Sequence, residues 1–192
     1  MNKPKTLTLL LLVMGLILIC SAAIFASSSK PAVTVRKIKP QVVLYTIYRG
    51  SHDGIGFAIG NLLSLAAENQ LQPEGPIYYV YLNNPEHVTS DHWLTEIRIP
   101  LDKKALKLAG TLGKMTDVKA LPSMDMAVAV KPEGTGDPRP IYKALYTWVF
   151  KQGYMVAGSW REVFLTNTMS GSYEQMKTEI MVTVHKISGN KD

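Results

Sequence analysis

The sequence predicts an α+β domain of two tandem, pseudo-symmetric modules, each with the order strand, helix, strand, strand, which form antiparallel sheet with two main helices. Three observations predict this class. The chain matches itself at a fixed separation, several runs alternate apolar and polar residues, and two further runs carry apolar stripes at helical spacing. An apolar segment before the modules is expected to form an additional N-terminal hydrophobic helix.

The two modules are visible as an internal repeat. The 83 positions that separate Glu96 from Glu179 place Thr95-Glu96-Ile97 on Thr178-Glu179-Ile180 without a gap. The same separation joins identical residues at helix, turn and strand positions, namely Leu62 with Leu145, Gly75 with Gly158, Val80 with Val163, Leu82 with Leu165, and Asn84 with Asn167. One shared motif would not produce matches in every kind of element, so the whole unit is duplicated.

The first module is expected to cover residues 41–101. Residues 42–48 are rich in β-branched and aromatic side chains and predict a strand, and the apolar stripe of residues 55–70 predicts a helix. Two more strands are expected at residues 77–82 and 94–101. In the second of these, the core face carries Ile97, Ile99 and Leu101, and the other face carries Glu96 and Arg98.

The second module is expected to cover residues 123–188. It has predicted strands at 124–130 and 178–186, a helix at 140–151 and a strand through Trp160, while Trp148 on the helix is assigned to the core. The final strand is expected to place Ile180, Val182 and Val184 on the core face. Residues 102–122 are interpreted as a connection, a weak helix or irregular segment that ends in an edge strand, and residues 31–40 as a linker.

Residues 1–30 differ from the rest, because a short basic start precedes a nearly uninterrupted apolar run at residues 7–26. Twenty residues are enough to span the hydrocarbon core of a bilayer. A signal anchor, a signal peptide cleaved near Ser21-Ala22-Ala23 and a lipoprotein modified at Cys20 all have this layout, although the bulky Ile19 disfavours the third. We expect a single N-terminal span with the domain outside the cytoplasmic membrane, or a secreted domain after cleavage.

The strand through Trp160 carries the sharpest functional signal. Because a strand has a period of two, Trp160, Glu162 and Phe164 share one face, and Val163 and Leu165 share the other. A carboxylate between two large aromatic rings is an unusual face to show to water, and burying it unpaired is costly. This face is expected to bind a ligand, and a cationic ligand would gain both charge pairing and cation–π attraction. The alternative is a glutamate that faces solvent or pairs with a nearby Lys or Arg.

Other aromatic residues are candidates for the walls of the same groove. In the repeat, Tyr79 is the counterpart of Glu162, and Ile77 and Tyr81 match Trp160 and Phe164. The candidate ligand-binding set is therefore Glu162, Trp160, Phe164, Tyr79, Tyr81 and Tyr48. Glu96 and Glu179 are expected on the same sheet face as Glu162, either assisting it or held in cross-strand ion pairs.

The order of these elements resembles a known family. A strand that ends in Gly, a helix, Gly-Pro or Gly-Ser, an aromatic strand and then Thr-Glu-Ile is similar to the GyrI-like small-molecule-binding domain, over residues 38–186. That domain is the effector-binding module of multidrug-responsive regulators and consists of two βαββ modules of the SHS2 type. The resemblance implies multidrug binding in a ligand groove with an acid on the penultimate strand of the second module, where Glu162 stands. The sequence departs from the family at Val130-Lys131-Pro132-Glu133-Gly134, where a His often precedes the glycine.

Several chemistries find no support in the sequence. Cys20 is the only cysteine and lies in the apolar run, which excludes a disulfide framework, a thiolate metal site and a cysteine nucleophile from the folded part. The four histidines have no metal-site spacing and are expected to be structural or solvated, and no Ser–His–Asp pattern, phosphate loop or dinucleotide fingerprint is present. We therefore predict no metal and no cofactor. We also predict no nucleic-acid partner, because the positive charges are scattered and the helix-turn-helix of the family's regulators is missing.

The expected function is binding of small amphipathic molecules, cations included, by a domain tethered to or exported across a membrane. Two alternatives use the same resemblance. Some proteins of the family look like hydrolases of electrophilic small molecules, with the groove acid activating water, but no catalytic residue is assigned here. GyrI-like proteins also resemble protein-interaction modules that inhibit a cytoplasmic topoisomerase. A haem-binding relative is the least favoured, because no histidine is predicted on the groove face.

Overall fold

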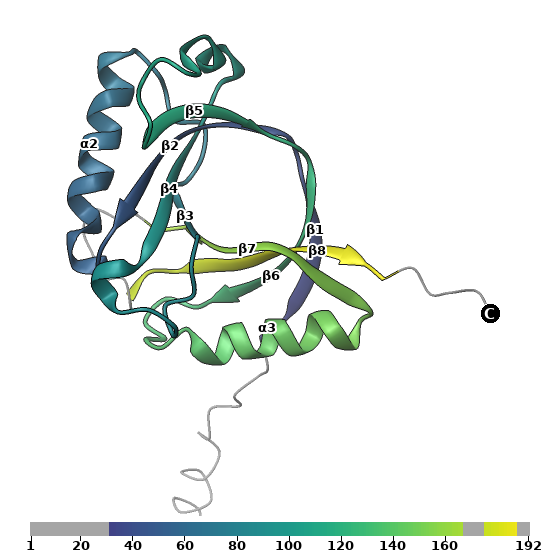
Figure 1. Cartoon of the computed structure of the whole chain (residues 1–192). Coiled ribbons are helices and arrows are strands. Elements are labelled where there is room, and N and C mark those ends of the chain that lie inside the picture. Colours follow the sequence, from purple (N-terminus) through teal and green to yellow (C-terminus); the bar gives the residue numbers. More distant parts are fainter. Residues whose placement is uncertain (1–30, 167–174, 188–192) are drawn as a thin grey trace, which may run out of the picture. The chain divides into compact units, whose positions relative to one another are not determined.

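The computed structural model describes residues 31–166 and 175–187 (Figure 1). These residues form an eight-stranded antiparallel sheet with the order β1-β6-β8-β7-β3-β4-β2-β5, together with the helices α2 and α3. This confirms the predicted α+β class. The apolar run 7–26, with its expected helix, lies outside the described residues. Within the two described ranges, no helix has the length and apolar character needed to cross a membrane.

The elements follow the predicted order. The strands are β1 (Val33–Ile38), β2 (Gln41–Arg49), β3 (Tyr78–Tyr81), β4 (Leu94–Leu101), β5 (Thr116–Leu121), β6 (Met124–Lys131), β7 (Tyr154–Phe164) and β8 (Thr178–Lys186). The helices are α2 (Ile55–Glu68) and α3 (Arg139–Lys151), with the 3-10 turns η2 (His52–Gly54), η3 (Ser90–His92) and η4 (Lys103–Leu108). A bulge interrupts the pairing of β7 with β8 between Val156 and Trp160. From Trp160 to Phe164 the pairing is regular, so the side chains there alternate between the two faces of the sheet.

The sheet divides into two halves between β3 and β7. One half contains β5, β2, β4 and β3 beside α2, and the other contains β1, β6, β8 and β7 beside α3. Tyr79 lies directly opposite Glu162 across this central pair of strands. Since these two residues are also repeat counterparts, the axis that relates the modules passes between them. The modules thus meet edge to edge, with Glu162 at the junction.

The segment 31–40, expected as a linker, contains the edge strand β1. The strand forms because Val33 and Val35 alternate with polar residues and pack against the core beside α3. The repeat separation carries Val33–Ile38 onto Thr116–Leu121, so β1 and β5 are counterparts. Their positions are exchanged, because β1 pairs with β6 of the second module while β5 pairs with β2 of the first.

Both helices cover the same face of the curved sheet, which we call the helix face (Figure 1). Against α2 pack Ile97, Ile99 and Leu101, and against α3 pack Ile180, Val182 and Val184, as predicted. Trp148 is half-buried beside the second of these clusters and stacks on Tyr154, in line with its assignment to the core.

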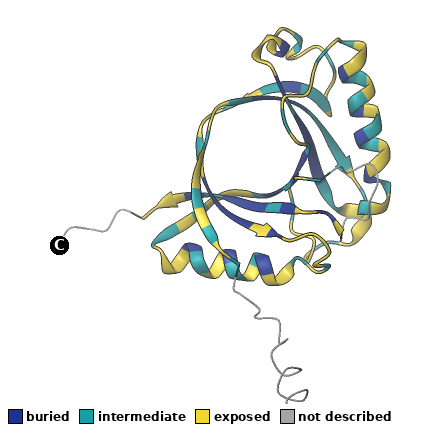
Figure 2. Ribbon diagram, turned by 180° about the vertical axis from the view of Figure 1, so that it is seen from behind, coloured by how far each residue is buried: buried dark blue, intermediate teal, exposed yellow. Residues whose placement is uncertain are grey.

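The opposite face, which we call the inner face, is apolar near its centre. It carries two smaller clusters, formed by Val43, Tyr78 and Val80 and by Met126, Val128 and Met181. Figure 2 shows that the strands are buried along much of their length while the outer sides of the helices are exposed. The central strands are therefore packed on both faces.

Candidate ligand-binding site at Glu162

Glu162 lies on the helix face of β7 and is buried, with 1% of its surface exposed. The alternative of a glutamate that faces solvent is therefore wrong. Two tyrosine hydroxyls replace water as its partners. Tyr142 of α3 donates to Oε1 at 2.6 Å, and Tyr81 of β3 donates to Oε2 at 3.0 Å. Hydrogen bonds of this kind offset the cost of burying a carboxylate.

Aromatic rings surround the carboxylate. Tyr79 lies opposite Glu162 on β3, and its ring meets the ring of Phe164 edge to face, with centroids 4.5 Å apart. Trp160 makes a similar contact with Tyr142, with centroids 5.1 Å apart. Four of the five predicted aromatic residues, Trp160, Phe164, Tyr79 and Tyr81, thus gather around Glu162 on one face.

Tyr48 is on the same face but is held differently. It pairs with Thr95 on β4 and packs against the cluster beside α2, and its hydroxyl donates to the Ser51 carbonyl at 3.0 Å. A Cβ added at Gly54 would lie 2.3 Å from the Tyr48 hydroxyl oxygen, so this close approach requires glycine. Tyr48 therefore supports the turn at the edge of the site.

Three residues of the site, His52, Trp93 and Tyr142, were missed by the sequence reasoning. His52, expected to be structural or solvated, stacks on Tyr79 at 6.4 Å and tilts against Tyr81 at 6.0 Å and Trp93 at 5.2 Å, all between ring centroids. The prediction that no histidine lies on the groove face is wrong, because the turn η2 places His52 over that face. The signal for Tyr142 was its position three residues before the core residue Leu145, which puts both on one side of the helix.

The site is arranged to keep its other ionisable groups neutral. Burial raises the pKa of Tyr79, and the negative charge of Glu162 raises it further, so the hydroxyl stays protonated. Burial lowers the pKa of His52, although the charges of Glu162 and Asp53 oppose this shift. The hydroxyls of Tyr81 and Tyr142 donate to the two oxygens of Glu162 beside these groups.

Glu96 and Glu179 do not join this site. Glu96 pairs with Val80 and Glu179 with Val163, so both lie on the inner face, and the expectation that they share a face with Glu162 is wrong. The reason is register, because the neighbours Ile97 and Ile180 are the residues opposite Tyr79 and Glu162. The alternative holds, since Glu96 forms ion pairs with Arg98 and Lys119 and Glu179 forms one with Arg36.

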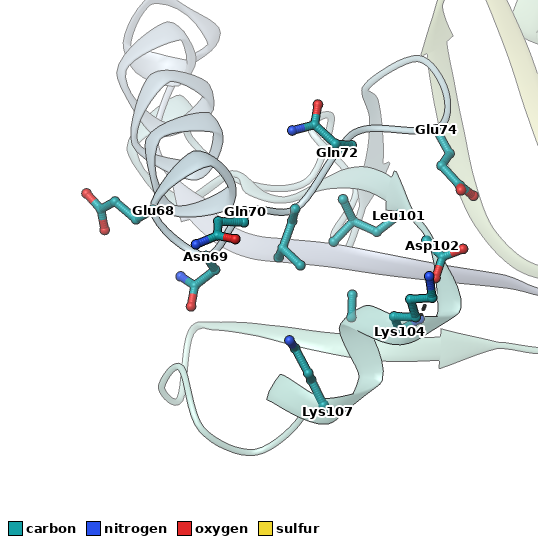
Figure 3. A pocket seen from close by; sticks show the side chains of 11 residues that line it. Glu68, Asn69, Gln70, Gln72, Glu74, Leu101, Asp102, Lys104 and Lys107 are labelled. Atoms are coloured by element: carbon teal, nitrogen blue, oxygen red, sulfur yellow. Dashed lines mark hydrogen bonds between the residues drawn. The ribbon is translucent and has the colours of Figure 1, made fainter.

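Two cavities open elsewhere on the domain. One of 540 Å³ lies where α2 ends, and Figure 3 shows its polar lining of Gln70, Glu68, Asn69 and the lysines 104 and 107. The other, of 420 Å³, lies on the inner face. Neither is lined by Glu162, whose surroundings are closed around it.

Comparison with known proteins identifies this architecture. The model of the GyrI-like small molecule binding domain matches residues 19–102. No curated protein matches the sequence. Among solved structures, EcmrR in a complex with DNA is similar with a TM-score of 0.69 and 13% identity, over 92% of this chain and 65% of that one. The present chain therefore spans 65% of the length of EcmrR.

Two further solved structures are also similar. The C-terminal domain of EcmrR has a TM-score of 0.65 at 13% identity, with 82% of this chain and 99% of that domain covered. A hydrolase from Listeria innocua has a TM-score of 0.62 at 10% identity, with 86% and 97% covered. At these identities the likeness is one of fold. The sequence match to the GyrI-like small molecule binding domain covers residues 19–102, and the structural likeness extends the similarity in fold to the rest of the described chain.

Proposed function

We propose that the domain binds small amphipathic cations, with Glu162 as the charge partner and the surrounding aromatic rings as the walls of the site. The observation that carries the proposal is a buried carboxylate at the junction of the two modules, oriented by Tyr81 and Tyr142 and enclosed by rings. The match to a small-molecule-binding family supports a ligand of this size.

The chemistry favours a cation. A carboxylate removed from water attracts a positive charge more strongly than an exposed one does, because the local dielectric constant is lower. The faces of Tyr79, Trp160 and Phe164 add cation–π attraction to an apolar cation that approaches them. A neutral molecule of the same shape gains only the apolar contacts, so charge separates the two classes.

Entry of a ligand requires a local movement, since the site is closed. Tyr142 lies in the first turn of α3, directly after a loop in which Gly134 and Gly136 have φ values of 70° and 68°. Residues of this kind let the backbone change direction at low cost. The ligand would then replace the hydrogen bond of Tyr142 when the start of α3 moves outward.

Replacing Glu162 by glutamine is expected to weaken binding of a cation by roughly 10- to 100-fold, because a charged partner is worth about 1.5–3 kcal/mol. Glutamine has nearly the same shape. Its oxygen still accepts from one tyrosine hydroxyl, and its NH2 group can donate to the other hydroxyl oxygen. The measurement is a titration of the full chain with an aromatic quaternary ammonium ion and its neutral carbon analogue, followed by tryptophan fluorescence, since Trp93 and Trp160 lie in the site.

Glu179→Gln is the matched control, because it removes a carboxylate from the other face and should leave cation affinity unchanged. The proposal would be contradicted if the Glu162→Gln variant bound the cation and its neutral analogue equally well, and bound each of them as tightly as the wild type does. Mass spectrometry of each mixture tests the alternative function. A ligand of altered mass would indicate that the domain is a hydrolase and not a binding module.

The proposal includes the location. We place the domain outside the cytoplasmic membrane, tethered by residues 7–26 or released by cleavage near Ser21-Ala22-Ala23, because an apolar run of this length at the N-terminus inserts as a signal does. Protease added to intact cells that express the full chain should digest the domain, and the intact mass should report cleavage. Protection until the cells are lysed would exclude this placement.

A further inference from the structure

The inner face of the sheet holds a buried arginine, Arg161, that forms no ion pair with any carboxylate in the described part of the chain. Arg161 lies on β7 next to Glu162 in the chain, but its side chain points to the opposite face and is 6% exposed. Its Nε–H meets no hydrogen-bond acceptor among the described residues, and one Nη donates to the sulfur of Met124 at 3.0 Å. A thioether is a weak acceptor, so a guanidinium with five donors has almost no hydrogen-bond compensation here.

The charges nearby do not neutralise Arg161. Glu96 is shared by two cations, Arg98 and Lys119, and Glu179 is paired with Arg36. Burial disfavours the charged form and lowers the pKa of Arg161. Tyr78 opposes this shift, and the positive charge of Arg98 acts in the same direction as burial. Arginine nevertheless remains protonated in proteins. The inner face therefore carries an excess of positive charge at a buried position.

A cavity opens at this position. The 420 Å³ cavity is lined by three cations, Arg161, Arg36 and Lys37, and by two acids, Glu74 and Glu179. The ring of Tyr78 and the apolar side chains of Ile38, Val163 and Met181 complete its wall. Its volume is within the range of small-molecule sites. The Arg161 guanidinium carbon lies 5.2 Å from the centre of the Tyr78 ring, so the cation and the ring face are presented together.

We propose that this inner-face cavity is a second ligand site, which binds small organic carboxylates with an apolar or aromatic body. The planar fork of a guanidinium matches a carboxylate and can hold it with two parallel hydrogen bonds. The carboxylate would supply the acceptor that Nε lacks, and the body of the ligand would lie against Tyr78, Val163 and Met181. The site is separate from the one at Glu162, since the two side chains leave β7 on opposite faces, and it prefers the opposite charge.

The test uses the full chain in a nonionic detergent, with detergent as the blank. The probes are 2-naphthoate and its neutral amide, and binding is measured by equilibrium dialysis. We expect the wild type to retain naphthoate and not the amide. Arg161→Met should weaken naphthoate binding about tenfold or more. It should also raise the melting temperature without ligand, because a buried charge that lacks a partner is replaced by an apolar side chain of similar length.

Controls separate this site from general charge effects. Arg36→Gln changes an exposed position and leaves Glu179 without its cation at the cavity, so it should weaken naphthoate binding several-fold. This variant keeps the proposal testable even if Arg161→Met does not fold. Arg139→Gln, on the exposed start of α3, and Glu162→Gln should both leave naphthoate binding unchanged. The inference is overturned if the wild type retains no more naphthoate than amide, if naphthoate binding is unchanged in both Arg161→Met and Arg36→Gln, or if Glu162→Gln abolishes it.

Discussion

Replacing Glu96 by glutamine is expected to lower the free energy of unfolding by about 3 kcal/mol, because it removes one partner from a buried group of charges. Glu96 is 4% exposed and pairs with Arg98, itself 9% exposed, and with Lys119 at 2.6 Å. Without the acid, Arg98 and Arg161 would lie against the same Tyr78 ring, with their guanidinium carbons 5.7 Å and 5.2 Å from its centre, and Arg98 would lose its carboxylate partner. Chemical denaturation of the two proteins measures the difference.

The repeat provides a matched control for this substitution. Glu179 is the counterpart of Glu96, but its partner Arg36 is 45% exposed, so Glu179→Gln should cost less than about 1 kcal/mol. The double variant Glu96→Gln, Arg98→Met should recover part of the loss, since the stranded cation is removed with its partner. Equal losses at Glu96 and Glu179 would show that burial does not set the cost.

Leu145→Ala and Leu62→Ala are each expected to destabilise the domain by about 2–5 kcal/mol, because both side chains are fully buried and leave a cavity. The two leucines are repeat counterparts on α3 and α2, and each packs its helix onto its own half of the sheet. The pairing of β3 with β7 and the exchanged edge strands join the halves, so each variant should shift one common unfolding transition.

Calorimetry and denaturant titration test this cooperativity, with Phe57→Ala as the control, since Phe57 on α2 is 82% exposed and should change stability little. Two separate transitions, of which Leu145→Ala moves only one, would contradict the expected coupling between the modules.

The fold was predictable because its signals are local. The alternation in β4 and β8 and the apolar stripes of α2 and α3 correctly placed the core residues, and the repeat showed that both modules share one plan. The edge strand β1 was missed because only Val33, Val35 and Ile38 mark it, and its polar residues resemble a linker. Its partner β6 lies some ninety positions further along the chain, a pairing that no local pattern contains.

The candidate site was predictable only in part. Alternation along β7 and the repeat counterpart of Glu162 placed four aromatic residues correctly around the acid. Burial of the acid was not predictable, because the Tyr142 hydroxyl that compensates it comes from a helix, and helix-to-sheet contacts depend on how the helix crosses the sheet. His52 was missed for a similar reason, since a turn carries no periodic signal to show which face it covers.

The exchanged edge strands determine where a pull on the N-terminus would act. Although β1 precedes the first module in the sequence, it pairs with β6 of the second, at the outer edge of the sheet. A force transmitted from residues 1–30 would therefore load the second module first and would separate β1 from β6. The same pairing affects folding during synthesis, because β1 is made early and cannot pair until residues 124–131 have been made. β1 thus stays unpaired while β2, β3, β4 and β5 can already pair with one another, and it is the strand that joins the domain to any tether.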